Sequence, residues 1–282
     1  MAKSLAGYVL YATLLAGLLL YYRFPAEAVE RYLAGEFART VPGAELIVGE
    51  TRPALPPGLI LEPVGVARAG TILLRLDRVR LRPALLSLFG DRPETDVEVR
   101  AFGGRLDGNL ILARSPDGGT PETASVRIAD IDLSGIEAFR DLSPHAVTGR
   151  LDGEIDYDGG DGAAILTVTD GGLEFAAPLF KLDRLSFARI EARLRLDGNR
   201  TLRLEECTLT GNQVGGNLSG TLTLATPAED SLLDLRGEIR PHPALFAALD
   251  DGIAMLFRRN RSGQPIPFSI RGSLASPRFS LE

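Results

Sequence analysis

The chain has 282 residues, 45% of them hydrophobic, and a formal net charge of −6 at neutral pH. A chain of this length can bury a core of its own, and its acidic balance gives no basic surface of the kind that binds nucleic acid. A single cysteine, Cys207, excludes an internal disulfide framework. Its surroundings predict a small core-facing residue rather than a reactive thiol.

The first apolar segment, Leu5–Tyr22, has 18 residues without charge or proline. As a helix it would be about 27 Å long, close to the thickness of a bilayer's hydrocarbon core. The segment therefore predicts a membrane anchor, with tyrosines at its ends suited to the membrane interfaces. The side chains expected to contact the membrane are those of Leu5, Tyr8, Leu10, Leu14, Leu18, Tyr21 and Tyr22.

A cleaved secretory signal is the alternative interpretation, because Ala26-Glu27-Ala28 matches a small-residue cleavage site. The apolar run exceeds the usual signal core of about 7–15 residues, which favours an uncleaved anchor. Both interpretations place the rest of the chain outside the cytosol.

Three parts are expected along the chain: a short tail and anchor over 1–23, a helix and connector over 24–58, and a β-rich body over 59–282. After Pro25, the apolar residues Val29, Leu33 and Phe37 share one helical face, and Pro42-Gly43 ends that helix. The prolines within 52–58 predict a rigid connector.

From Leu59 onward, apolar and charged residues alternate, which is typical of strands with one buried face. The segment 72–82 slips phase once near Asp77 and predicts a strand with a bulge. Short connections favour antiparallel pairing, so we expect a mainly β fold as a sandwich, a barrel or a curved open sheet. The side chains expected to line its apolar face, or groove, are Leu74, Leu76, Val97, Val99, Leu106, Leu110, Leu194, Leu196, Leu222, Leu224 and Ile270.

The segment 243–258 departs from this alternation and predicts one of a few short amphipathic helices. Its apolar side chains could cover the groove. They are Phe246, Leu249, Ile253 and Phe257.

Patterns that carry chemistry are few. The two histidines, His145 and His242, lie far apart in sequence, so neither a metal site nor a catalytic residue nor a cofactor is predicted. Five carboxylates do cluster in sequence, and alternate strand positions would place four of them on one face. A solvated outer face is the preferred interpretation, and weak calcium binding or a glycosidase-like cleft are the alternatives. The five are Asp152, Glu154, Asp156, Asp158 and Asp161.

Short glycine-containing motifs recur in the strands, at Gly103–Gly108, at Gly215–Leu222 and at Ile270–Arg278, which has the spacing I-x-G-x-L-x-x-P. With these motifs the chain resembles the type II secretion system protein N family (GspN), and similar strand edges mark the broader AsmA-like proteins. The resemblance implies an N-terminal transmembrane helix in a bacterial inner membrane and a periplasmic body formed by a large curved antiparallel β-groove. It transfers no catalytic residue.

The resemblance implies a non-enzymatic scaffold, assembly or binding subunit of the type II secretion system. Its partners would be inner-membrane lipid and other subunits of that system. The AsmA-like connection implies an alternative, in which the groove holds a lipid ligand in transit between membranes. A carbohydrate-active enzyme using Asp152–Asp161 is the third interpretation. An oligomer is compatible with the first two.

Overall fold

The fold was determined from a computed structural model of the chain. The structure describes Tyr8, Tyr11 and Leu15, and residues 21–41, 43–54, 58–68, 70–87, 90–113, 120–136, 146–179, 182–226, 230–248 and 265–281. Within these residues the protein is mainly β, and its strands form one 15-stranded antiparallel sheet. The prediction of a mainly β, antiparallel fold is therefore confirmed.

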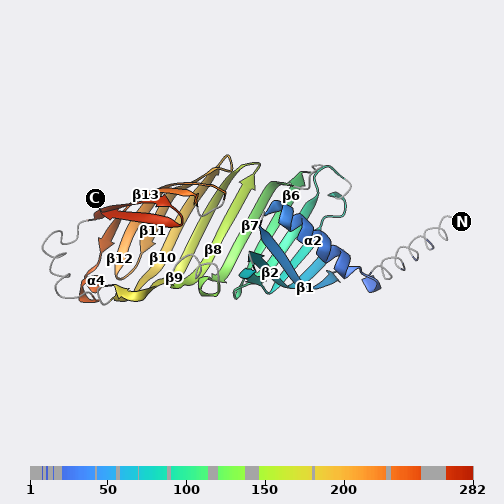
Figure 1. The fold of residues 1–282 in the computed structure, drawn as a ribbon, viewed down its shortest axis with the longest axis horizontal. Coiled ribbons are helices and arrows are strands. Elements are labelled where there is room, and N and C mark those ends of the chain that lie inside the picture. Colours follow the sequence, from blue (N-terminus) through green and yellow to red (C-terminus); the bar gives the residue numbers. More distant parts are fainter. Residues whose placement is uncertain are drawn as a thin grey trace.

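The strands follow one another in the sheet almost entirely in chain order. From β4 to β15 each strand pairs with the next, and at the other end β2 pairs with β1, β3 and β4. Figure 1 shows them side by side along the long axis, from blue to red. The strands are β1 (Ala44–Ala54), β2 (Gly58–Arg68), β3 (Thr71–Leu76), β4 (Arg78–Pro83), β5 (Glu94–Ala101), β6 (Gly104–Ala113), β7 (Thr120–Asp132), β8 (Ala146–Asp158), β9 (Asp161–Leu179), β10 (Leu182–Asp197), β11 (Thr201–Thr210), β12 (Val214–Thr223), β13 (Leu232–Pro241), β14 (Ile266–Ser273) and β15 (Ser276–Leu281).

Tight turns explain why neighbouring strands are antiparallel. Phe102 and Gly103 join β5 to β6 with φ values of 51° and 75°. Two consecutive residues with positive φ twist a hairpin in the sense that its strands require. A connection this short leaves no room for the helical crossover that parallel strands need.

Three helices have bounds within the described residues. They are α2 (Ala26–Thr40), the 3₁₀ helix η2 (Leu133–Gly135) and α4 (Pro243–Ala248). Helix α2 packs on β1, in which Ala44 is buried, and Leu61, Val64 and Ala67 are buried in the adjacent β2. The predicted helix after Pro25 is thus confirmed, and the best-buried part of the core lies at this end of the sheet.

The predicted anchor lies mostly outside the described residues. Of its expected side chains, Leu5, Leu10, Leu14 and Leu18 are not described, while Tyr8, Tyr21 and Tyr22 are helical and exposed. No helix within the described part of the chain has the length and hydropathy to cross a membrane. The anchor therefore stays a prediction.

Two element predictions were wrong. Residues 72–82 form two strands, β3 and β4, separated at Asp77, because β3 pairs with the second half of β2 and β4 with its first half. The connector expected over 52–58 is, where described, the end of β1 and the first residue of β2, with Ala54 opposite Gly58. Strand β1 therefore adds to the sheet a strand that was not predicted.

Candidate functional site: the apolar face of the sheet

The strand register brings the apolar residues of β5–β15 into continuous rows on one face. We call the residues of three such rows the apolar face. The first row is Val97, Gly108, Val126, Ile155, Ala164, Leu194, Leu204, Gly220, Leu235, Ile270 and Phe279; the second is Val99, Leu106, Ile128, Gly153, Leu166, Ala192, Cys207, Leu218, Gly237, Phe268 and Leu281; the third is Thr95, Leu110, Ala124, Tyr157, Gly162, Leu196, Leu202, Leu222, Leu233, Gly272 and Pro277. None of these residues is charged.

Eight of the eleven residues predicted to line a groove lie in these rows. They are Val97, Val99, Leu106, Leu110, Leu194, Leu196, Leu222 and Ile270. Leu74 and Leu76 lie on β3, opposite Val66 and Val64. Leu224 follows the last residue of β12 and is exposed. The rows extend the predicted set by glycines and alanines, which the alternation of large apolar residues does not reveal.

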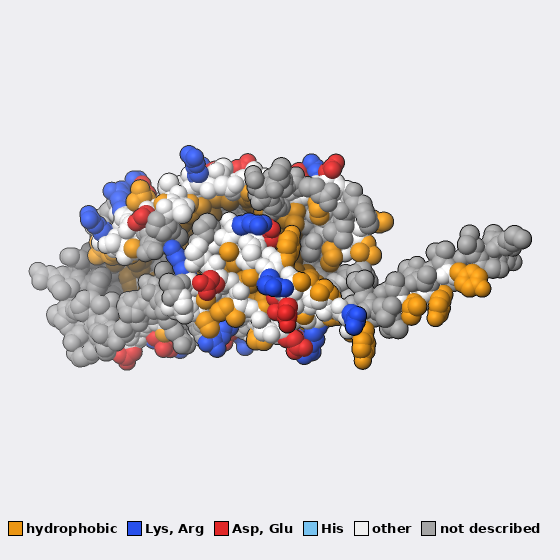
Figure 2. All heavy atoms as spheres, turned by 45° about the vertical axis from the view of Figure 1, so that its right-hand side comes forward, with side chains coloured by type: hydrophobic (Ala, Val, Ile, Leu, Met, Phe, Trp, Pro, Cys, Tyr) orange, Lys and Arg blue, Asp and Glu red, His pale blue; other side chains and the backbone are white. Residues whose placement is uncertain are grey.

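The apolar face is only partly buried. Of its residues, only Ile128, Cys207 and Phe268 are buried, and Phe279 and Leu281 at the last strand are more than half exposed. A sheet that packs on a second layer buries such side chains almost completely. Hydrophobic side chains are visible in the hollowed part of the surface in Figure 2. Among the described residues, the apolar face therefore lacks the covering layer of a sandwich.

Cys207 lies in the second row, as expected for a core-facing residue. Burial raises the pKa of its thiol, and the apolar side chains around it offer no charge that would stabilise a thiolate. Both effects disfavour the thiolate in the folded chain. The prediction of a small core-facing residue is confirmed, because Cys207 is buried.

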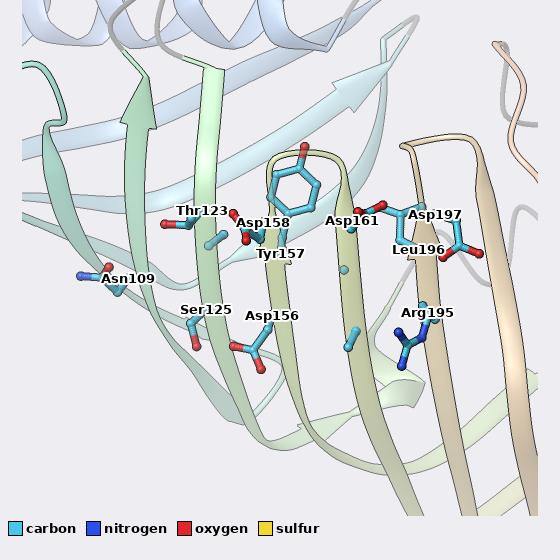
Figure 3. Close-up of a pocket in the computed structure, with 13 residues that line it drawn as sticks. Asn109, Thr123, Ser125, Asp156, Tyr157, Asp158, Asp161, Arg195, Leu196 and Asp197 are labelled. Carbon is cyan, nitrogen blue, oxygen red and sulfur yellow. The ribbon is translucent and has the colours of Figure 1, made fainter.

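Backbones approach one another closely at several glycines of the face. A Cβ at Gly220 would lie 2.2 Å from the carbonyl oxygen of Asp234, and one at Gly237 would lie 2.2 Å from that of Asn217. Both positions admit only glycine without a shift of the backbone. Figure 3 shows the neighbouring strands β7 to β10 bending along their length.

The helix predicted to cover the apolar face is described only at its beginning. Phe246 lies in α4, whereas Leu249, Ile253 and Phe257 lie outside the described residues. Whether this segment covers the face stays a prediction.

The opposite face of the sheet is charged. Arginines and carboxylates from adjacent strands form ion pairs there, including Arg195 with Glu205 at 2.8 Å and Arg82 with Glu98 at 2.7 Å. The exposed pairs among them, such as Arg195 with Glu205, each contribute little to the free energy of unfolding. Together they keep this face solvated, so the sheet has one charged and one apolar surface.

The acidic cluster lies on this charged face. Asp152, Glu154, Asp156 and Asp158 occupy alternate positions of β8, as predicted, and all are exposed. A shallow depression of about 540 Å³ is lined by Asp156, Asp158 and Asp161, together with Asn109, Ser125, Arg195, Asp197 and others. Figure 3 shows Asn109, Ser125 and Asp156 projecting from neighbouring strands.

Several of these carboxylates have structural partners. Asp161 accepts a hydrogen bond from the backbone N–H of Gly198 at 2.9 Å. Asp152 accepts a hydrogen bond from the backbone N–H of Asp130 at 3.0 Å. Glu154 forms an ion pair with Arg127 at 3.0 Å. Within the described residues, no three His, Cys, Asp or Glu side chains are grouped so as to hold a metal ion. The solvated outer face remains the preferred interpretation.

Comparisons with protein-family models, with curated proteins and with solved structures found no match to this chain.

Proposed function

We propose that the chain is a non-enzymatic, membrane-tethered protein whose apolar face binds the acyl chains of lipids. The observation that carries this proposal is the uncharged, partly exposed face that continues across eleven strands. An exposed apolar surface of this extent is costly in water and is typical of an interaction site. Acyl chains suit it because rows of aliphatic side chains offer dispersion contacts without hydrogen-bonding groups.

The proposed arrangement is a curved, AsmA-like groove held at a bacterial inner membrane by residues 5–22, with its body in the periplasm. The charged face would meet the aqueous compartment, and the apolar face would hold lipid. Support comes from the division of charged and apolar residues between the two faces. The I-x-G-x-L-x-x-P motif forms the β14–β15 hairpin, in which Gly272 lies opposite Pro277.

A scaffold or assembly subunit of the type II secretion system is the second candidate. In that case the segment that starts with α4 would close the apolar face, and the partners would be other subunits of the system. The start of a helix at Pro243, where one was predicted, favours this candidate.

Lipid analysis of the full chain separates the two candidates. The protein would be purified in mild detergent, and its lipids would be extracted and identified by mass spectrometry. Copurifying phospholipid supports the lipid-binding function. Monodisperse protein free of lipid contradicts it and favours the scaffold.

Two neighbouring residues of β9 provide matched variants. Leu166 lies on the apolar face, and Ile165 lies on the charged face and is 57% exposed. Leu166→Lys should hold less lipid than the parent chain, because it puts an ammonium group among acyl chains, whereas Ile165→Lys should hold as much as the parent. Circular dichroism of both variants checks that the sheet is intact. Equal lipid content in the two folded variants would mean that the lipid does not bind to the apolar face.

A further inference from the structure

The turn between β4 and β5 presents apolar side chains to solvent. Leu85 is 49% exposed and Leu86 is 90% exposed. Fully burying one leucine side chain is worth about 1.5–3 kcal/mol relative to leaving it in water. Leaving two adjacent leucines exposed in one connection is therefore costly.

The same turn is firmly braced by hydrogen bonds. The N–H of Ser87 donates to the carbonyl oxygen of Ala84 at 3.0 Å. The N–H of Ala84 donates to the carbonyl oxygen of Glu94 at 2.9 Å. The hydroxyl of Ser87 donates to Ala84 at 2.7 Å and accepts from the N–H of Glu94 at 2.9 Å. These bonds hold the backbone of the turn, so Leu85 and Leu86 are presented outward by a fixed structure.

The position of the turn relates it to the N-terminal segment and to the apolar face. It follows β4, which lies two strands from β1 in the sheet, and helix α2 packs on β1 (Figure 1). It begins directly after Pro83, which lies opposite Thr95 at the start of the third row of the apolar face. The turn is thus at the rim of that face, at the end of the sheet that the predicted anchor holds.

We propose that Leu85 and Leu86 insert into the bilayer that holds residues 5–22. This inference rests on the membrane attachment in the proposed function. A bilayer is the occupant that fits, because the chain's own apolar segment brings one to this end of the sheet. Arg92 beside the turn pairs with Glu122 at 2.8 Å but its side chain stays 72% exposed, and an arginine in that position suits the headgroup region. The insertion sets the rim of the apolar face against the membrane, so that acyl chains can pass between them with little exposure to water.

The chain contains no tryptophan, so a single introduced tryptophan reports on its own position. Leu86→Trp would be reconstituted as the full chain into vesicles of phosphatidylcholine and phosphatidylglycerol with brominated acyl chains. The matched control is Leu232→Trp, which is 58% exposed on the charged face at the other end of the sheet. We expect Leu86→Trp to emit at shorter wavelength and to lose most of its fluorescence to the brominated chains. The control should be quenched by aqueous iodide instead.

Two results would overturn the insertion. If Leu86→Trp is quenched by iodide as strongly as the control, the turn lies in water. If it is shielded from iodide but untouched by brominated chains, a protein covers the turn. Flotation of both variants with the vesicles tests the attachment separately, and a chain that does not float contradicts the attachment and the insertion together.

Discussion

Among single residues, the glycines of the apolar face are the most constrained. At Gly220 the backbone has a φ of 146°, and the carbonyl oxygen of Asp234 occupies the space that a Cβ would need. Gly35 in α2 is the opposite case, because nothing lies within 4 Å of a Cβ built there. Glycine at position 220 thus allows two strands to pack closely, whereas glycine at position 35 lowers the stability of the helix without allowing any closer contact.

Alanine at these two glycines should change stability in opposite directions. Gly220→Ala should lower the free energy of unfolding by about 1–3 kcal/mol, because the methyl group clashes with backbone and the φ angle is unfavourable. Gly35→Ala should raise it by about 0.5–1 kcal/mol. Urea unfolding followed by circular dichroism measures both. A stable Gly220→Ala variant would show that β12 and β13 are further apart than described.

Asp132 is a second residue with a defined role. Its carboxylate accepts hydrogen bonds from the hydroxyl and the N–H of Ser134, at 2.7 and 2.9 Å, and so caps η2. These bonds, the one from the hydroxyl first, lower the pKa of Asp132. Because the folded pKa lies below the unfolded one, the stabilisation is complete above about pH 4 and is lost as pH falls through the folded value.

Asp132→Ala should therefore destabilise the protein by about 0.5 kcal/mol at pH 7, the low end for caps, since the site is exposed. The difference from the parent chain should shrink below about pH 4. Urea midpoints at pH 7 and pH 3 test this, with Ser134→Ala expected to behave similarly. A difference that does not depend on pH would mean that the carboxylate charge plays no part.

Among the elements, regular alternation predicted most strands, and tertiary pairing decided the rest. The residues from Asp96 to Phe102 alternate cleanly and form β5 with the turn that follows. β1 was not predicted because the prolines near Pro53 suggested a connector, although Pro53 pairs with Leu59 at the edge of the sheet. The break at Asp77 follows from which half of β2 each strand pairs with, and local sequence carries no such information.

Helix α2 allows a test of packing at the element level. Phe37 is half-buried in α2, which packs against β1, whereas Tyr32 on the same helix is 66% exposed. Phe37→Ala should cost about 1–3 kcal/mol, less than a fully buried phenylalanine, and Tyr32→Ala should change stability by less than about 0.5 kcal/mol. Urea unfolding of the pair measures the difference. Equal effects would mean that α2 contributes little to the fold.

For the whole molecule, eight of the eleven residues predicted from the sequence lie in the apolar face, but the sequence did not predict how far that face extends. Leu194 and Leu196 were predicted from alternation, yet Ala164 and Gly220 belong to the same rows through strand pairing alone. Alternation identifies a face within one strand, while the register across strands depends on turns and bulges. The extent of the apolar face therefore depends on the register of eleven strands, which the sequence alone does not give.

That extent predicts how much lipid the protein holds. Eleven strands spaced about 4.8 Å apart make the apolar face roughly 50 Å long. One acyl chain spans about half of the ~30 Å hydrocarbon core of a bilayer, or roughly 15 Å. The face therefore has room for about three chains end to end, more than the two chains of one phospholipid when each lies along it.

Native mass spectrometry of the full chain, released from detergent, should show species with more than one bound phospholipid. Leu166→Lys should reduce the number of bound lipids, because its charge divides the face near its middle, and Ile165→Lys should leave the number unchanged. A single phospholipid at saturating lipid concentration would mean that much of the face is covered by the protein itself. In that case the segment that begins with α4 is the first candidate for the cover, and its removal should restore the higher lipid number.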